Sequence, residues 1–93
     1  MPKFLVVHKT LTKPLSIEEG TPLMKRIAAN MTSEAYWISA WCQANAKGEA
    51  VKIMCHWDAT SIEVLRKAVT KLVPELPVEG IYPLLKFESG DFR

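Results

Sequence analysis

Apolar and polar residues alternate with two different periods along this chain. Residues 3–10 (KFLVVHKT) combine aromatic and β-branched side chains and end before a polar stretch that contains Pro14, which is typical of a strand. Further along, apolar residues recur every three or four positions, which is the spacing of one helix face: Leu23, Met24, Ile27, Ala28 and Met31. The chain therefore begins with a strand and continues into a helix.

Two signals compete for the start of this helix. Ser16, with Glu19 three residues later, fits a capping box, in which each side chain binds the other residue's backbone amide. Thr21 as N-cap with Pro22 at the first helical position is an equally good start, because the amide that proline lacks is not needed there. The sequence leaves both starts open.

The second half of the chain repeats the alternation. Residues 35–44 (AYWISAWCQA) and 50–57 (AVKIMCHW) are predicted strands, joined by a turn at NAKG. A helix follows over residues 61–72, with Thr60 and Glu63 as a capping box and Asp58 as a rival N-cap. Residues 78–87 (VEGIYPLLKF) are the last strand, and Pro83 within it favours the sheet edge. Residues 88–93 are expected to fray. The second helix buries one apolar stripe: Ile62, Leu65, Val69 and Leu72.

This order of elements predicts one α+β domain over residues 1–93 with the ferredoxin-like βαββαβ arrangement. Right-handed crossovers place both helices on one face of a four-stranded antiparallel sheet and leave the other face open. We expect the first and third strands to be central, parallel neighbours. Since the open face carries Trp and Met side chains, a second copy is expected to cover it, which makes the protein a homodimer with a dimeric α+β barrel.

The two histidines are the candidate chemistry of the open face. Parallel first and third strands would bring His8 and His56 to the same end of the sheet. If Leu5 and Val7 pack under the helices together with Cys55, alternation turns both histidines to the open face. We prefer this assignment because it buries the more apolar set of side chains.

The register of the central hairpin decides which residues surround the histidines. An even-numbered loop centred between Ala46 and Lys47 places Trp37 opposite His56. If Gly48 instead takes the left-handed position of a three-residue loop with a bulge, Ile38 faces His56, and both Trp37 and Trp41 join the core. The first register, which we favour, builds a ligand pocket on the open face from Trp37, Ser39, Trp41, Met54, His56 and His8.

Composition narrows the class of protein. The 93 residues are 48% hydrophobic, and twelve basic against ten acidic side chains give a formal net charge of +2. The basic residues are scattered, which disfavours nucleic acid as a partner. No apolar run approaches a membrane span, and the opening stretch is too short in apolar residues for a signal peptide. We therefore expect a cytoplasmic protein with no membrane partner, in which Cys42 and Cys55 are reduced thiols.

Three stretches resemble a known family. MPKFLVVHKTL resembles the opening of small bacterial ferredoxin-like proteins of unassigned function that include nickel-binding members, whose first strand often carries a histidine where His8 stands. AVKIMCHWDATSIEVLRKA is similar to their third strand and second helix, with Cys55 at a position that is commonly cysteine, and LPVEGIYPL is similar to their last strand. The resemblance implies a bacterial protein and a divalent metal, nickel, with His8 and His56 as the ligands available here.

The chain departs from the nickel-binding relatives in its histidines. Those relatives carry additional histidines in the first strand and the second helix, whereas Lys9 follows His8 here and residues 63–73 contain none. A metal site would therefore draw on both subunits, on carboxylates or on water. We expect a protein that binds a small ligand or a divalent metal at the open face. The alternatives are a dimeric-barrel enzyme, such as a small-molecule monooxygenase or isomerase, and a non-enzymatic interaction module.

Overall fold

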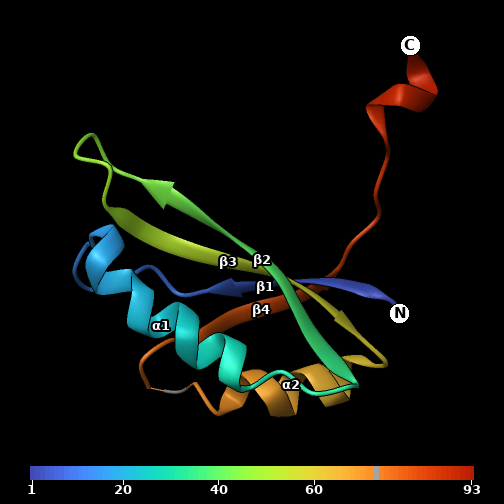
Figure 1. The fold of residues 1–93 in the computed structure, drawn as a ribbon, viewed down its shortest axis with the longest axis horizontal. Helices are drawn as coiled ribbons and strands as arrows, with labels where there is room; N and C mark the ends of the chain where they lie inside the picture. The colour runs from blue at the N-terminus through green and yellow to red at the C-terminus, as the bar shows by residue number, and fades with distance from the viewer. Residues whose placement is uncertain (73) are drawn as a thin grey trace.

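The computed structural model describes residues 1–72 and 74–93 and has the predicted order of elements. The strands form one four-stranded antiparallel sheet in the order β2-β3-β1-β4, and both helices cover the same face of it (Figure 1). This is the ferredoxin-like βαββαβ fold. The elements are β1 (Lys3–His8), α1 (Ile17–Ala29), β2 (Ala35–Ala44), β3 (Ala50–Ala59), α2 (Ile62–Thr70), β4 (Val78–Pro83) and the 3-10 turn η1 (Ser89–Phe92).

The capping box at Ser16 starts α1. The amide of Glu19 donates to Ser16 Oγ over 3.1 Å, and the amide of Ser16 donates to Glu19 Oε1 over 3.0 Å. Two of the amides that lack a partner at a helix N-terminus are satisfied in this way. The alternative start at Thr21 is wrong, and Pro22 lies inside the helix.

The start of α2 lies one residue later than predicted. β3 stays extended to Ala59, and Ser61 is the N-cap, whose Oγ accepts a hydrogen bond from the amide of Val64. Neither Thr60 nor Asp58 caps this helix. Asp58 is instead a residue of β3, where it lies opposite Lys3 on the open face of the sheet.

The prediction that β1 and β3 run parallel is wrong. They are the central neighbours, as expected, but they pair antiparallel, with Phe4 opposite Trp57 and Val6 opposite Cys55. The reason is the connectivity: α1 carries the chain from β1 to β2, which therefore runs parallel to β1, and the hairpin then reverses β3. The C-terminal ends of β1 and β3 consequently lie at opposite ends of the sheet.

The hairpin between β2 and β3 combines features of both expected registers. Gly48 has a φ of 77°, as the bulged loop requires. The register shifts near the turn and shifts again at Ile38, so Ser39 lies opposite His56 and Trp41 lies opposite Met54. Each shift adds one unpaired residue, as β-bulges do. The predicted pairing of Trp37 with His56 is wrong, because Trp37 lies opposite Trp57.

The core lies between the sheet and the two helices. Alternate side chains of β1 and β3 point to this side, and Trp57 is the largest side chain that is fully buried. From the helices, Ile27 of α1 and Leu65 and Val69 of α2 complete the layer. The buried apolar side chains that define this core are Phe4, Val6, Ile27, Ala35, Ile53, Cys55, Trp57, Ala59, Leu65, Ala68, Val69, Leu72 and Leu76.

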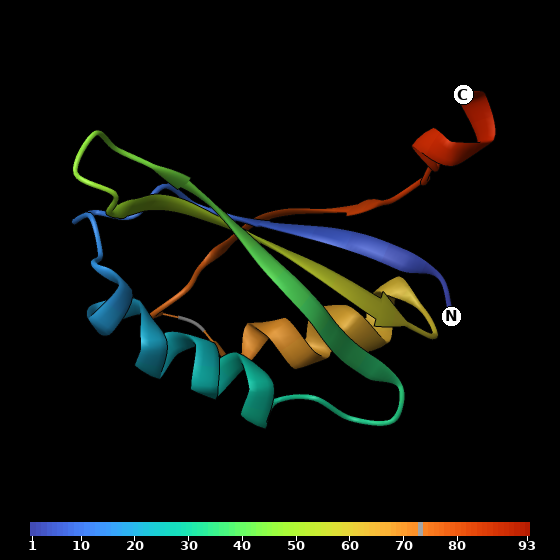
Figure 2. The same ribbon diagram turned by 45° about the horizontal axis from the view of Figure 1, so that its top comes forward.

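β4 occupies a sheet edge, as Pro83 predicts, but it ends at that proline rather than at Phe87. Residues 84–93, which we call the C-terminal arm, leave the sheet on the side away from the helices (Figure 2). The arm is held at its root by a 2.8 Å hydrogen bond from the amide of Leu84 to the carbonyl of Lys3. Among the described residues, no helix has the length and apolarity that a membrane crossing needs.

Gly48 provides a test of the hairpin geometry. Its positive φ disfavours any residue with a Cβ, by about 1–2 kcal/mol, but asparagine tolerates this region better than alanine. We expect Gly48→Ala to lower the free energy of unfolding by about 1–2 kcal/mol in urea titrations, and Gly48→Asn to lower it by less. Gly90→Ala, in the exposed arm with open space around its Cβ, is the matched control. Equal stabilities for G48A and G90A would contradict the turn described here.

Candidate functional site

The open face of the sheet is the side that neither helix covers. Cross-strand pairs place Leu5 beside His56 and Val7 beside Met54 on this side. Ser39 and Trp41 of β2 join them through their pairing with β3. All of these side chains except Trp41 are partly buried, and Trp41 remains 67% exposed. The middle of the open face is therefore largely apolar, with His56 and Ser39 as its polar groups, and the ion pair of Lys3 and Asp58 lies toward one end.

His8 does not lie on the open face, which corrects the sequence-based assignment. The antiparallel register puts Phe4, Val6 and His8 on the helix side, and the His8 side chain is fully buried. His56 pairs with Leu5, three residues before His8 along β1. At about 3.3 Å per residue, the two histidines are displaced by roughly 10 Å along the sheet and point to opposite faces.

The buried His8 ring is held by the end of the α2–β4 connection. Its Nδ1 lies 3.1 Å from the carbonyl oxygen of Leu76, and because a carbonyl can only accept, Nδ1 carries the proton. Nε2 has no hydrogen-bond partner among the described residues. Burial lowers the pKa of His8 below its ordinary value of 6.5, while the Leu76 and Pro77 carbonyls act in the opposite direction. His8 is therefore a neutral, structural residue at pH 7.

His56 lies beside the ion pair of Lys3 and Asp58 on the open face. Its Nε2 lies 3.6 Å from Asp58 Oδ1, and the same oxygen is 3.2 Å from Lys3 Nζ. The distance of Asp58 Oδ1 from His56 Nε2 is too long for a hydrogen bond. His56 Nε2 has no hydrogen-bond partner among the described residues, so no hydrogen bond fixes which ring nitrogen carries the proton and which one donates to a ligand.

A pocket of about 470 Å³ opens beside His56, between the sheet and the C-terminal arm. This is within the usual size range of small-molecule sites. Trp41 and Phe87 give it aromatic walls, and its polar groups are hydroxyl, imidazole and ammonium, with no carboxylate in its lining. The lining residues are Lys3, Ser39, Trp41, His56, Leu84, Leu85, Lys86 and Phe87.

Four of the six residues in the predicted pocket share the open face, and two do not. Ser39, Trp41, Met54 and His56 lie there, and all except Met54 line the pocket. Trp37 packs against the core on the helix side, where its indole Nε1 donates to the carbonyl of Ser39 over 2.9 Å. His8 lies on the helix side for the reason given above. Sequence reasoning missed Lys3 and residues 84–87, whose role depends on where the arm folds.

The proposed metal ligands are not brought together within one chain. His8 and His56 occupy opposite faces, and the part of the chain that the structure describes contains no group of three or more His, Cys, Asp or Glu side chains arranged to hold a metal ion. His56 and Asp58 alone offer one nitrogen and one carboxylate on the open face. Metal binding by this protein stays a prediction.

Both cysteines face the helix side of the sheet. Cys55 lies opposite Val6 and is fully buried, as expected for the residue next to an outward-facing His56, and burial raises the pKa of its thiol to about 12. Cys42 lies opposite Ile53 nearer the hairpin turn and is exposed, and partial desolvation raises its pKa as well. Neither thiol is adjacent to the His56 pocket.

The fold and this pocket together define a class, namely a ferredoxin-like α+β protein with a lined cavity on its open sheet face. Comparison of the chain with family models, with curated proteins and with solved structures finds no match. Its function therefore has to be argued from the site itself.

The buried His8 predicts a loss of stability in mild acid. The unfolded chain takes up a proton near pH 6.5, whereas the folded chain resists it, so stability is complete above about pH 6.5 and decreases below it until the folded pKa is reached. The slope contributed by His8 is at most about 1.4 kcal/mol per pH unit. Urea titrations between pH 5 and 7.5 measure it.

His8→Gln should be less stable at pH 7 but should lose this part of the pH dependence, because an amide can still donate to Leu76 and does not titrate. His56→Gln is the matched control and should keep the slope. A H8Q variant with the same slope as the unmodified protein would show that other groups produce the effect.

Proposed function

We propose that this protein is a homodimeric binding protein that holds a small planar acid in the pocket beside His56. The observation that carries the proposal is the pocket's combination of aromatic walls and two ammonium groups, those of Lys3 and Lys86, each of which also has one acidic partner outside the lining. Trp41 and Phe87 lie in its lining together with His56, Lys3 and Lys86, and no acidic residue lines it. A flat aromatic molecule with one carboxylate matches this lining.

The charges favour an anionic rather than a neutral ligand. The ammonium group of Lys3 binds Asp58 Oδ1 over 3.2 Å, but the Lys3 side chain is 40% exposed and has donor capacity left for a ligand. Lys86 pairs with Glu88 on the arm, which raises the pKa of the Lys86 ammonium and keeps it charged. Asp58 lies beneath the pocket, beside His56. A carboxylate ligand would therefore meet up to three donors, and hydrogen bonds to charged groups are worth about 1.5–3 kcal/mol.

A small acid is favoured over a metal ion for the same site. Because His8 lies on the other face, His56 and Asp58 are the two side chains of one chain that could bind a metal ion at this site. Two side chains are fewer than the three or more that a metal site usually needs, and the part of the chain that the structure describes holds no group of three. An enzymatic role would need a second acid or base beside the ligand, and the polar lining of the pocket supplies His56 alone in that role.

A second copy is the occupant that best covers the open face. Six large apolar side chains of this face and of the arm are at least half exposed. If each has a full surface of about 150–250 Å², their exposed parts add up to roughly 800 Å². A stable interface buries about 800 Å² on each partner. Phe87 and Phe92 pack edge to face at 6.0 Å but remain 73% exposed each, and Leu85 is 82% exposed. Trp41, Tyr36 and Tyr82 supply the surface on the sheet.

The ligand proposal is tested with 2-naphthoate and its uncharged analogue 2-naphthalenemethanol, by isothermal titration calorimetry. We expect the acid to bind roughly ten-fold more tightly than the alcohol, because the difference is one charge-assisted hydrogen bond. His56→Ala and Lys86→Met should each weaken binding of the acid by about the same factor. Lys9→Met removes one positive charge outside the pocket and is the matched control.

Equal affinities for the acid and the alcohol, or an unchanged affinity in H56A, would contradict the proposal. The alternative that the site binds a metal ion is tested by measuring the melting temperature of the unmodified protein and of H56A. A rise in melting temperature with nickel, copper or zinc that H56A abolishes would favour a metal ion in this site over an organic acid.

The dimer is tested by light scattering during size-exclusion chromatography. Leu85→Glu combined with Phe87→Glu places two charges on the exposed part of the arm, and we expect this double variant to be monomeric where the unmodified protein is a dimer. Ile17→Glu is the matched control: Ile17 is 80% exposed at the start of α1, on the helix side, and the variant should remain dimeric. If the unmodified protein is monomeric at about 100 µM, the proposed dimer is contradicted.

A further inference from the structure

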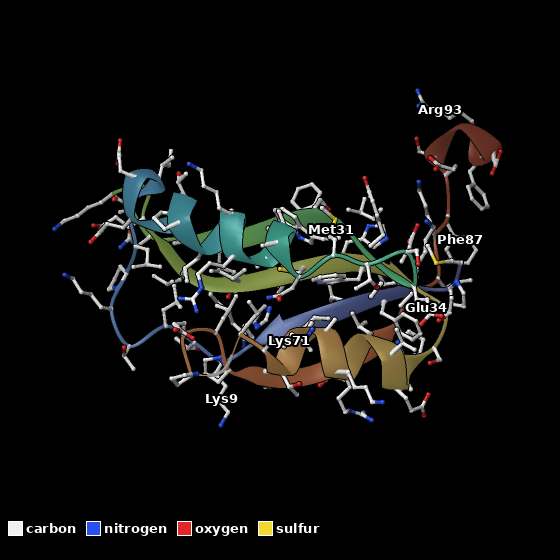
Figure 3. The ribbon with its side chains drawn as sticks, turned by 60° about the horizontal axis from the view of Figure 1, so that its bottom comes forward. Lys9, Met31, Glu34, Lys71, Phe87 and Arg93 are labelled. Atoms are coloured by element: carbon white, nitrogen blue, oxygen red, sulfur yellow. The ribbon has the colours of Figure 1, made fainter. Side chains whose placement is uncertain are left out.

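A second cavity lies on the other side of the sheet, between the first turns of α1 and the β2–β3 hairpin. Its volume is about 240 Å³, and it is separated from the His56 pocket by the sheet itself. Figure 3 views the molecule from the helix side, with α1 lying across β2 and β3. The cavity is therefore independent of the site discussed above.

The cavity exists because both of its walls carry small side chains. In α1, the residue that packs fully into the core is Ile27, in the second half of the helix. In the first half, Gly20 and Thr21 face the gap, and a Cβ added at Gly20 would meet nothing within 4 Å. The facing wall is formed by Cys42, Ala44 and Ala50. Small residues on both sides leave a space that the backbone cannot close.

The chemistry of the lining disfavours charged and strongly polar ligands. No charged residue lines the cavity. Each of its two hydroxyls makes one hydrogen bond within the helix: Ser16 Oγ accepts from the amide of Glu19, and Thr21 Oγ1 donates to the carbonyl of Ile17 over 2.9 Å. This leaves one donor on Ser16 and acceptor capacity on Thr21 as the hydroxyl groups open to a ligand. The remaining walls are aliphatic or thioether groups, together with the thiol of Cys42, whose pKa is raised by desolvation so that it is neutral at pH 7. A polar ligand in this cleft would lose part of its hydration against largely apolar walls that replace few of its hydrogen bonds.

We propose that this cavity is a binding site for an uncharged apolar molecule of the size of a monocyclic arene or a short alkyl chain. A closed cavity of about 150 Å³ with apolar walls is enough to bind benzene, and the space here is open to solvent beside Ile17 and Cys42, which are exposed. The larger space here accommodates a substituted ring or a chain of comparable bulk. A peptide fits this chemistry less well, because the side chains of the lining offer its amides only the hydroxyls of Ser16 and Thr21 and the weakly bonding thiol of Cys42.

The proposal is tested with toluene, by two-dimensional NMR of the ¹⁵N-labelled protein. Binding should shift the amide signals of Gly20, Met24, Cys42 and Ala44, and leave those of His56 and Trp41 in place. Cys42→Leu fills the space and should weaken toluene binding roughly ten-fold or more. Gln43→Leu adds the same side chain to the next residue of β2, on the opposite face, and should bind toluene as the unmodified protein does.

A second variant and a second measurement keep the proposal testable if Cys42→Leu folds poorly. Gly20→Leu fills the same space from the helix side. Alkylation of Cys42 by iodoacetamide, followed by mass spectrometry, should become several-fold slower in saturating toluene, whereas Cys55 is buried and should stay unmodified with or without toluene. Absence of shifts at the cavity in the unmodified protein, or unchanged binding in both filled variants, would overturn the proposal.

Discussion

The antiparallel pairing of β1 with β3 is the constraint on which the rest of this molecule depends. With Val6 opposite Cys55 and Phe4 opposite Trp57, the register assigns each side chain of the two central strands to the core or to the open face. It sends His8 into the interior, and it leaves His56 and Asp58 outside. Because side chains alternate along a strand, a shift of one residue in this register would exchange the two sets.

The sheet thus separates two chemically different spaces. The open side carries a pocket whose polar groups are His56, Ser39 and the ammonium groups of Lys3 and Lys86, closed on one side by the C-terminal arm. The helix side carries an apolar cavity under the first half of α1. Charged ligands are compatible with the first space alone, since it has donors and access to solvent, and hydrocarbons are compatible with the second.

The C-terminal arm belongs both to the pocket and to the exposed apolar surface of the proposed dimer. The arm extends from the sheet edge with Leu85 and Phe87 largely in solvent, and the same two residues line the pocket. A partner that covers the arm would also bury the pocket, strengthen its electrostatic interactions and exclude water from the ligand. Under the proposed dimer, ligand binding and dimer formation would be coupled, because Leu85 and Phe87 line the pocket and also belong to the surface that a partner would cover.

The sequence by itself determined the elements and their order, because capping residues, prolines and hydrophobic periods act over a few neighbouring positions. The box at Ser16, the apolar stripe of α2 and the edge position of β4 are local signals of this kind. Cys55 was placed correctly in the core, since side chains alternate along a strand and its neighbour His56 faces outward. Only the tertiary structure decided the face of β1, because KFLVVH is apolar on both sides and its register is set by the partner strand. It also decided the bulge at Ile38, the place of Trp37 and the course of the arm beside His56, which all depend on residues distant in the chain.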